Sequence, residues 1–251
     1  MVTTVGQEDL IWGRNVVTNA LKSGRALNRV LIGTERGGGM AAIRALAQER
    51  RIPVENVSRQ RLDDLTGGAI HQGVVAFTAP RLYSDVADIL ARAEARGEPP
   101  LVVVLAHVED PRNLGATART AAAAGAHGII IPMRRAAPIT GVAEKAAAGA
   151  LDHIPVARVV NLRRCLNDLK TAGLWAVGAD MDGETLYFEA DLTGPVVLVV
   201  GGEDKGLGRL LARECDFTVR IPMQSEVTSL NTSVAASLLL YEVVRQRRQT
   251  Y

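Results

Sequence analysis

Aromatic residues and cysteines are scarce in this chain of 251 residues: aromatics make up 4% of it, and there are two cysteines. So few aromatics predict cores built from aliphatic side chains. Cys165 and Cys215 stand alone, with no C-x-x-C pair, so we expect two reduced thiols rather than a disulfide, a zinc site or another metal centre. No apolar run approaches the ~18–20 residues that span a bilayer, so no membrane-spanning helix is expected.

We also expect no secretory signal. The opening segment, MVTTVGQEDLIWGR, has no basic stretch followed by an apolar one. Together with the unpaired cysteines, this favours a location in the cytoplasm.

The net charge of +2 is too small to indicate a nucleic-acid binder. Its distribution is uneven, because residues 1–80 hold ten Lys and Arg against seven Asp and Glu (+3), and residues 81–251 hold nineteen against twenty (−1). A modestly basic front half favours a polyanionic partner. An ordinary solvated surface explains the same numbers equally well.

The front of the chain predicts a small α/β domain, which we place at residues 1–78. Short apolar runs indicate strands, and they alternate with helical patterns, the first of which ends at Gly24. This order is typical of a sheet with helices packed on it. The predicted elements are a helix at 14–23, a strand at 28–33, a helix at 40–50, and strands at 53–57 and 73–78.

Residues 79–98 break this alternation. They open at Ala79-Pro80 and close near Gly97, around a charged stretch at 84–96. Because Pro and Gly interrupt regular structure, we expect a linker that carries one exposed helix.

Residues 99–251 show a clearer alternation of strand and helix. Repeated units of this kind imply a mainly parallel sheet that is covered on both faces. Ligands bind beyond the carboxyl ends of the strands in such sheets, which singles out the loops at 107–113, 201–206 and 222–230. The predicted strands are 101–106, 128–131, 154–159, 174–179, 195–200 and 216–221, and the predicted helices are 113–125, 140–150, 161–172 and 229–248.

The first of these loops leads into a helix with a single charge. Asn113 is a good N-cap for it. Arg119 stands among Ala, Thr, Leu and Gly, a composition suited to burial. A buried guanidinium needs an anionic or carbonyl partner. A structural carboxylate and a substrate phosphate explain the arginine equally well.

The second loop has four glycines within the eight residues GGEDKGLG, 201–208. Glycines permit tight turns and the close approach of a ligand. The loop is not a P-loop, because no Gly-Lys-Ser/Thr ends the required spacing. It is not a dinucleotide-binding fingerprint either, because Gly206-x-Gly208 lacks a third small residue.

The third loop leads into an apolar helix. Thr228 or Ser229 caps that helix in the simplest account. Asn231 and Ser233 place further polar groups in its first turn. The N-terminus of a helix also offers N–H donors to an anion or a polar ligand.

Two other functions remain open at this point. Residues 37–42 fit G-x-G-x-x-A, and Glu55 follows at the distance of a dinucleotide-binding motif, although the front domain has too few strands for that fold. A non-enzymatic RNA-binding module is the second alternative. His71 suits contact with RNA, and a structural histidine explains it equally well.

The three loops together resemble the signature motifs of the SpoU-type RNA ribose methyltransferases, which belong to the SPOUT or α/β-knot class. The matching stretches are EDPRNLGATARTAAAAGAHGIII, LVVGGEDKGLGRLL and IPMQSEVTSLNTSVAASLLLYEVVRQR. The likeness reaches the front half through LIWGRNVVTNALKSG and IHQGVVA, so it covers nearly the whole chain. Within the family, it is greatest to bacterial enzymes that methylate a guanosine of 23S ribosomal RNA, with transfer RNA as the alternative substrate.

This resemblance implies a C-terminal parallel-sheet α/β domain tied in a trefoil knot, at residues 99–251. It also implies a small N-terminal α/β domain that is similar to ribosomal protein L30e and binds RNA. The implied assembly is a homodimer. The implied cofactor is S-adenosyl-L-methionine, and the implied acceptor is the 2′-oxygen of a ribose in RNA. Periodicity predicts neither the knot nor the dimer.

The resemblance further implies which residues form the site. Ser225 and Thr232 depart from the family, which usually has Gly and Val at these positions, and neither change removes a polar catalytic group. The positions that match catalytic and substrate-site residues are Asn113, Arg119, Glu203, Ser229 and Asn231. Those that match contacts to S-adenosylmethionine are Gly201, Gly202, Ile221, Met223 and Leu230.

The implied reaction is an in-line displacement, so the protein must align the reactants, exclude water and remove one proton. A guanidinium stays protonated in proteins. We therefore favour Arg119 as the group that holds the phosphate beside the target ribose, with Glu203 or water accepting the proton. A structural role for Glu203 is equally consistent. Asn113 and Asn231 would orient the arginine and the ribose, and Ser229 either of them.

Overall fold

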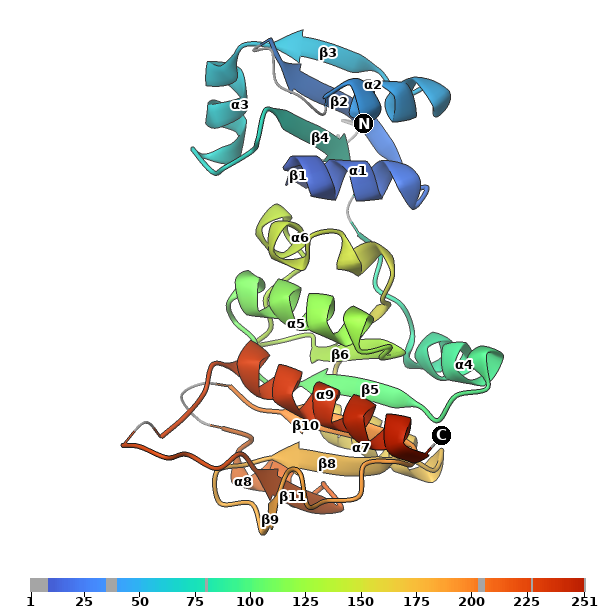
Figure 1. Cartoon of the computed structure of the whole chain (residues 1–251), viewed down its shortest axis with the longest axis vertical. Coiled ribbons are helices and arrows are strands. Elements are labelled where there is room, and N and C mark those ends of the chain that lie inside the picture. Colours follow the sequence, from blue (N-terminus) through green and yellow to red (C-terminus); the bar gives the residue numbers. More distant parts are fainter. Residues whose placement is uncertain (1–8, 35–39, 80, 203–205, 227, 251) are drawn as a thin grey trace, which may run out of the picture.

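The computed structural model describes residues 9–34, 40–79, 81–202, 206–226 and 228–250. It contains two β-sheets with helices packed on them, one above the other along the long axis (Figure 1). The first sheet and its helices are called the N-terminal unit (residues 9–78), and the remainder the C-terminal unit (residues 81–250). The predicted α/β class is confirmed.

The N-terminal unit has a four-stranded sheet in the order β1-β4-β2-β3. β4 runs antiparallel to both β1 and β2, and β2 pairs with β3 in parallel. A sheet with one parallel pair is not a dinucleotide-binding fold, so that alternative is wrong; the glycines on which it rested, 37–39, lie outside the described residues. The elements are β1 (Asp9–Trp12), α1 (Arg14–Lys22), β2 (Leu27–Gly33), α2 (Met40–Glu49), β3 (Val54–Val57), α3 (Arg59–Thr66) and β4 (Val74–Thr78).

The C-terminal unit has a seven-stranded sheet in the order β7-β6-β5-β10-β8-β11-β9, and all its strand pairs are parallel. The strands are β5 (Leu101–Leu105), β6 (Gly128–Pro132), β7 (Val156–Val159), β8 (Trp175–Ala179), β9 (Thr185–Leu186), β10 (Val196–Val200) and β11 (Phe217–Arg220). The helices are α4 (Val86–Arg96), α5 (Pro111–Ala123), α6 (Gly141–Ala147), the 3₁₀ turn η1 (Ala150–Asp152), α7 (Leu162–Thr171), α8 (Arg209–Ala212) and α9 (Thr232–Thr250).

Helices cover both faces of this parallel sheet, as the alternation predicts. Side chains of α5, α6 and α9 pack in one apolar cluster with one set of strand residues. Side chains of α4, α7 and α8 pack in a second cluster with the other set. β5 and β10 lie in the middle with every residue buried, which explains their unbroken apolar runs. None of the described helices is both long and apolar enough to cross a membrane.

The helix placed in an exposed linker is a correction to the sequence analysis. α4 packs on the C-terminal sheet through Ile89, and both Ile89 and Ala93 are buried. Its capping box at Asp85 and Asp88 defines its start. Ile89 and Ala93 lie among charged residues, so the composition of the segment suggested an exposed helix. The domain boundaries at 78 and 99, the trefoil knot and the similarity to L30e stay predictions.

A buried cluster of four charged residues joins the two units. Glu144 of α6 accepts hydrogen bonds from Arg25, at 2.6 Å, and from Arg81, at 2.9 Å. Asp152 of η1 pairs with the same two arginines. The side chains of Glu144 and Asp152 are 2% and 4% exposed. Burial opposes ionisation of Arg81, but the two carboxylates outweigh it and raise the pKa of its guanidinium. The two carboxylates therefore favour the charged form of Arg81.

Close backbone contacts surround this cluster. A side chain at Gly141 would overlap the Trp12 ring, and one at Gly149 would overlap Asn19. The amide of Asn19 donates to the carbonyl oxygen of Ala148 at 2.9 Å. The units therefore share a tight interface, and α6 carries it.

Replacing Glu144 with alanine should destabilise the protein. The change leaves Arg25 and Arg81 buried with one carboxylate between them, and breaking a buried ion pair costs about 3–5 kcal/mol. The control is Glu94→Ala on the exposed side of α4, which should change stability by less than ~0.5 kcal/mol. Urea denaturation measures both. Equal effects of the two substitutions would show that the cluster does not stabilise the fold.

Candidate functional site

A cleft of about 610 Å³ lies at the carboxyl edge of the C-terminal sheet. Its volume falls in the range of ~300–1,000 Å³ that is usual for small-molecule sites. The segments after β8, β10 and β11 form it, together with the residues that lead into α9. Two of the three predicted loops therefore converge here. The lining residues on which the argument depends are Asp180, Asp182, Gly201, Gly202, Ile221, Met223, Ser229, Leu230 and Thr232.

The glycine loop closes on itself at the floor of this cleft. Gly202 and Gly206 exchange two backbone hydrogen bonds, of 3.1 and 3.0 Å. A side chain at Gly201 would overlap the backbone of Gly206, and one at Gly202 would press on His107. Larger residues are therefore excluded at both positions, because neighbouring chain segments fill the space that a side chain would need.

The helix after the third loop begins later than the sequence predicts. α9 starts at Thr232, and the Asn231 carboxamide oxygen accepts from the Ser233 N–H at 2.9 Å. Asn231 is therefore the cap, and the prediction of Thr228 or Ser229 is wrong. The buried Thr232 hydroxyl donates to the Gly201 carbonyl oxygen at 3.2 Å. This departure from the family pattern thus ties α9 to the glycine loop.

A hydrogen bond between two asparagines joins the first loop to the third. α5 begins at Pro111 with Asp110 as its N-cap, so Asn113 is not the cap that the sequence suggested. Its carboxamide oxygen instead accepts from Asn231 Nδ2 at 2.9 Å. The carboxamides of two predicted catalytic residues therefore meet beside the cleft.

Arg119 differs most from the prediction. The side chain is exposed rather than buried, and it does not line the cleft with Gly201 and Leu230. The small residues of α5 are explained by close helix packing instead, since a side chain at Gly115 would overlap the backbone of α6. The small residues of α5 therefore reflect its contact with α6. They do not show which face of the helix carries Arg119.

The other predicted residues are placed as follows. Gly201, Gly202, Ile221, Met223 and Leu230 all line the cleft, and so does Ser229. Glu203 lies outside the described residues.

Sequence reasoning missed a fourth segment of the cleft, residues 179–182, which follows β8. Asp180 holds it in place, because its backbone N–H donates to the Val219 carbonyl oxygen at 3.0 Å and its carboxylate accepts from the Asp182 N–H at 3.0 Å. The sequence could have indicated this segment, because β8 was predicted and its carboxyl end lies at the same edge of the sheet.

The described part of the chain contains no group of three or more His, Cys, Asp and Glu side chains arranged for a metal ion. The two cysteines are free. Burial raises the pKa of the Cys165 thiol to about 11, which disfavours the nucleophilic thiolate.

Comparison with known proteins adds the identity of the family. Residues 100–241 match the SpoU rRNA methylase family, and residues 10–84 match a family described as RNA 2′-O ribose methyltransferase substrate binding. A Bacillus subtilis protein, the putative TrmH family tRNA/rRNA methyltransferase YacO, is 45% identical over 96% of this chain and 97% of its own. An uncharacterised tRNA/rRNA methyltransferase of Mycolicibacterium smegmatis is 43% identical over 96% of this chain and 78% of its own.

Solved structures agree. The SpoU methyltransferase AviRb from Streptomyces viridochromogenes superposes with a TM-score of 0.82 at 29% identity, over 97% of this chain and 91% of its own. The AdoMet-bound rRNA methyltransferase from Sinorhizobium meliloti gives a TM-score of 0.78 at 30% identity, over 95% and 87% of the two chains. The chain therefore belongs to the SpoU rRNA methylase family and is an S-adenosylmethionine-dependent RNA 2′-O-methyltransferase.

Proposed function

We propose that this enzyme methylates the ribose 2′-oxygen of a guanosine in 23S ribosomal RNA, in the cytoplasm, as a homodimer. The observation that carries the methyl transfer is the convergence of the glycine loop and the start of α9 on one cleft. Transfer RNA is the alternative substrate, since several relatives are named tRNA/rRNA methyltransferases.

Coverage of the similar structures favours ribosomal RNA. One similar structure is described as concerning the 2-OH methylation of C/U34 on tRNA. It covers 60% of this chain and 98% of its own, so the remainder of this chain has no counterpart in it. The rRNA methyltransferase from Sinorhizobium meliloti matches 95% of this chain. An additional RNA-binding unit suits a large folded RNA in which the target must be located by more than one contact.

The cleft fits S-adenosylmethionine. Gly201 and Gly202 line it with backbone alone, and Ile221, Met223 and Leu230 add apolar surface. Asp180 and Asp182 bring negative charge to the same cleft, which suits a sulfonium cation. When bound, the cofactor supplies a methyl group that is already activated for displacement.

The protein's own residues would then align the acceptor. Asn113 and Asn231 hold each other through their carboxamides, and both lie at the first turn of a helix. Together with Ser229 they would orient the ribose, and Arg119 would bind the adjacent phosphate. Glu203 or water would accept the 2′-hydroxyl proton. Fixed positions of this kind contribute up to ~7–11 kcal/mol to such a reaction.

The proposed dimer explains the exposed Arg119. α9 presents Val234 and Tyr241, which are 46% and 51% exposed, on one outward stripe. Ala123 of α5 lies in a hollow next to Tyr241, one helical turn beyond Arg119. A second copy packed on this α5–α9 face would cover the apolar stripe. Arg119 of each chain would then reach the cleft of the other chain.

Isothermal titration with S-adenosylmethionine tests the cleft. Gly201→Ala should weaken binding by about tenfold or more, because the added carbon overlaps Gly206 and displaces the loop. Gly194→Ala is the matched control, since a side chain there meets open space. Normal binding by the Gly201 variant would remove this cleft from consideration as the cofactor site.

Arg119→Lys tests the proposed phosphate contact. Lysine keeps the charge but loses the paired N–H groups, so methylation of 23S rRNA from a strain lacking the gene should slow by about 10²-fold or more. Transfer of labelled methyl measures the rate, and unchanged binding of S-adenosylmethionine is the control. A near-normal rate in the variant argues against a bidentate grip by Arg119.

Mixing two inactive variants tests whether the site is shared between subunits. In a mixed dimer of Arg119→Ala and Gly201→Ala chains, one site would combine an intact arginine with an intact glycine loop. Coexpression should therefore restore methylation that neither variant shows alone. If Arg119 instead served the cleft of its own chain, every site in the mixture would be defective and no activity would return.

A further inference from the structure

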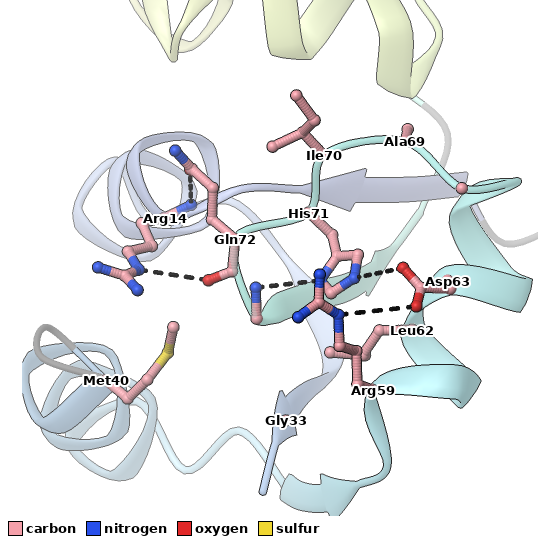
Figure 2. A pocket seen from close by; sticks show the side chains of 12 residues that line it. Arg14, Gly33, Met40, Arg59, Leu62, Asp63, Ala69, Ile70, His71 and Gln72 are labelled. Atoms are coloured by element: carbon pink, nitrogen blue, oxygen red, sulfur yellow. Dashed lines mark hydrogen bonds and ion pairs between the residues drawn. The ribbon is translucent and has the colours of Figure 1, made fainter. Parts of the chain in front are cut away.

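A second cavity, of about 340 Å³, lies in the N-terminal unit. Figure 2 shows it between the end of β2, the start of α2, helix α3 and the loop 67–73. It is near the lower end of the range for small-molecule sites, so it suits a single nucleobase better than a dinucleotide. The residues that matter here are Arg14, Met40, Arg59, Asp63, His71 and Gly73.

One wall carries an ordered pair of polar side chains. His71 is 6% exposed, and its Nδ1 accepts the N–H of Gly73 at 3.0 Å. The proton of a neutral imidazole is therefore on Nε2, which donates to Asp63 Oδ1 at 2.9 Å. This histidine is structural: it orients the carboxylate of Asp63, which is itself 38% exposed. Asp63 Oδ2 pairs with Arg59 Nε at 3.8 Å, so the wall presents a carboxylate held between a histidine and an arginine, and each of its oxygens has a lone pair left to accept a further hydrogen bond.

The rest of the cavity combines apolar surface with positive charge. Met40 and Leu62 supply the apolar surface, and Arg14 and Arg59 bring guanidinium groups to the rim. Arg14 Nε donates to the Gln72 carbonyl oxygen at 3.3 Å, and its terminal nitrogens point away from the loop in Figure 2. A base could lie against the apolar surface while its phosphate meets the arginines.

The loop that shapes the cavity is held in an unusual conformation. Gln72 has a φ of 54°, which is uncommon for a side chain other than glycine, and Gly73 follows with a φ of 82°. Gln72 Oε1 accepts from the Arg14 backbone N–H at 3.0 Å and from Lys145 Nζ, on α6, at 3.4 Å. These bonds hold the loop against the C-terminal unit. Backbone strain of this kind is often found at functional sites.

We propose that this cavity binds one unpaired guanine of the RNA substrate, away from the methylated ribose. This rests on the proposed function, which makes RNA the substrate. Asp63 only accepts hydrogen bonds, and guanine presents two N–H donors, N1–H and N2–H, on its Watson–Crick edge. Helix α3, which lines the cavity, and the carboxyl ends of β5 and β8 lie on the same side of the view in Figure 1, to the left. One RNA surface can therefore reach both sites.

Titration of the whole protein with GMP, AMP, CMP and UMP tests the proposal, with amide signals of Gly33 and Gly73 followed by NMR. GMP should bind about fivefold or more tightly than the other three. Asp63→Asn should abolish that preference, because its amide replaces an acceptor with a donor. Met40→Trp should fill the cavity and abolish all four responses. Arg61→Ala, an exposed arginine on α3 that does not line the cavity, is the control and should respond normally.

With 23S rRNA as substrate, Met40→Trp should raise KM several-fold and leave kcat and the binding of S-adenosylmethionine unchanged, which also verifies that the variant is folded. No response to any nucleotide, equal responses to all four, or responses retained in Met40→Trp would overturn the proposal. Failure of the proposed function is a separate result. In that case the unchanged enzyme would not methylate 23S rRNA, whatever the result of the GMP titration.

Discussion

The buried ion cluster of Arg25, Arg81, Glu144 and Asp152 is the constraint on which the arrangement of the molecule depends. The side chains of Glu144 and Asp152 are almost fully buried and depend on these arginines as partners, so movement of Arg25 away with the N-terminal unit would break their salt bridges. α6 carries one carboxylate of this cluster and packs against α5, which follows the first of the three loops singled out in the sequence. The N-terminal unit and the edge of the sheet that holds the cleft are therefore joined through a short path.

The cleft itself depends on close backbone approach rather than on charged side chains. Glycines stand where chain segments meet, and Thr232 and the Asn113–Asn231 pair fix three loops to one another. Such a site is assembled only when distant segments have all reached their final places. It therefore couples correct folding of the sheet to the presence of a binding surface.

The sequence predicted much of this architecture, because long apolar runs and helical periods are local signals. Strands β5 and β10 and helix α7 lie within a few residues of their predicted positions. The start of α9 and the cap of α5 were misplaced, since several residues in each loop can cap a helix and tertiary contacts choose among them. The orientation of Arg119 was not predictable, because it depends on which face of α5 packs against α6. The residues around Arg119 in α5 are small on every side, so composition did not distinguish the packed face from the exposed one.

The central position of β10 has a consequence for synthesis of the chain. β10 pairs along its whole length with β5, with Val196 opposite Leu101, so 95 residues must be made before that edge of β5 gains its neighbour. At about 5–20 residues per second, the ribosome needs roughly 5–20 s for this stretch. During that time an all-aliphatic strand has one unpaired edge. Until β10 is made, that edge of β5 remains available to pair with other strands.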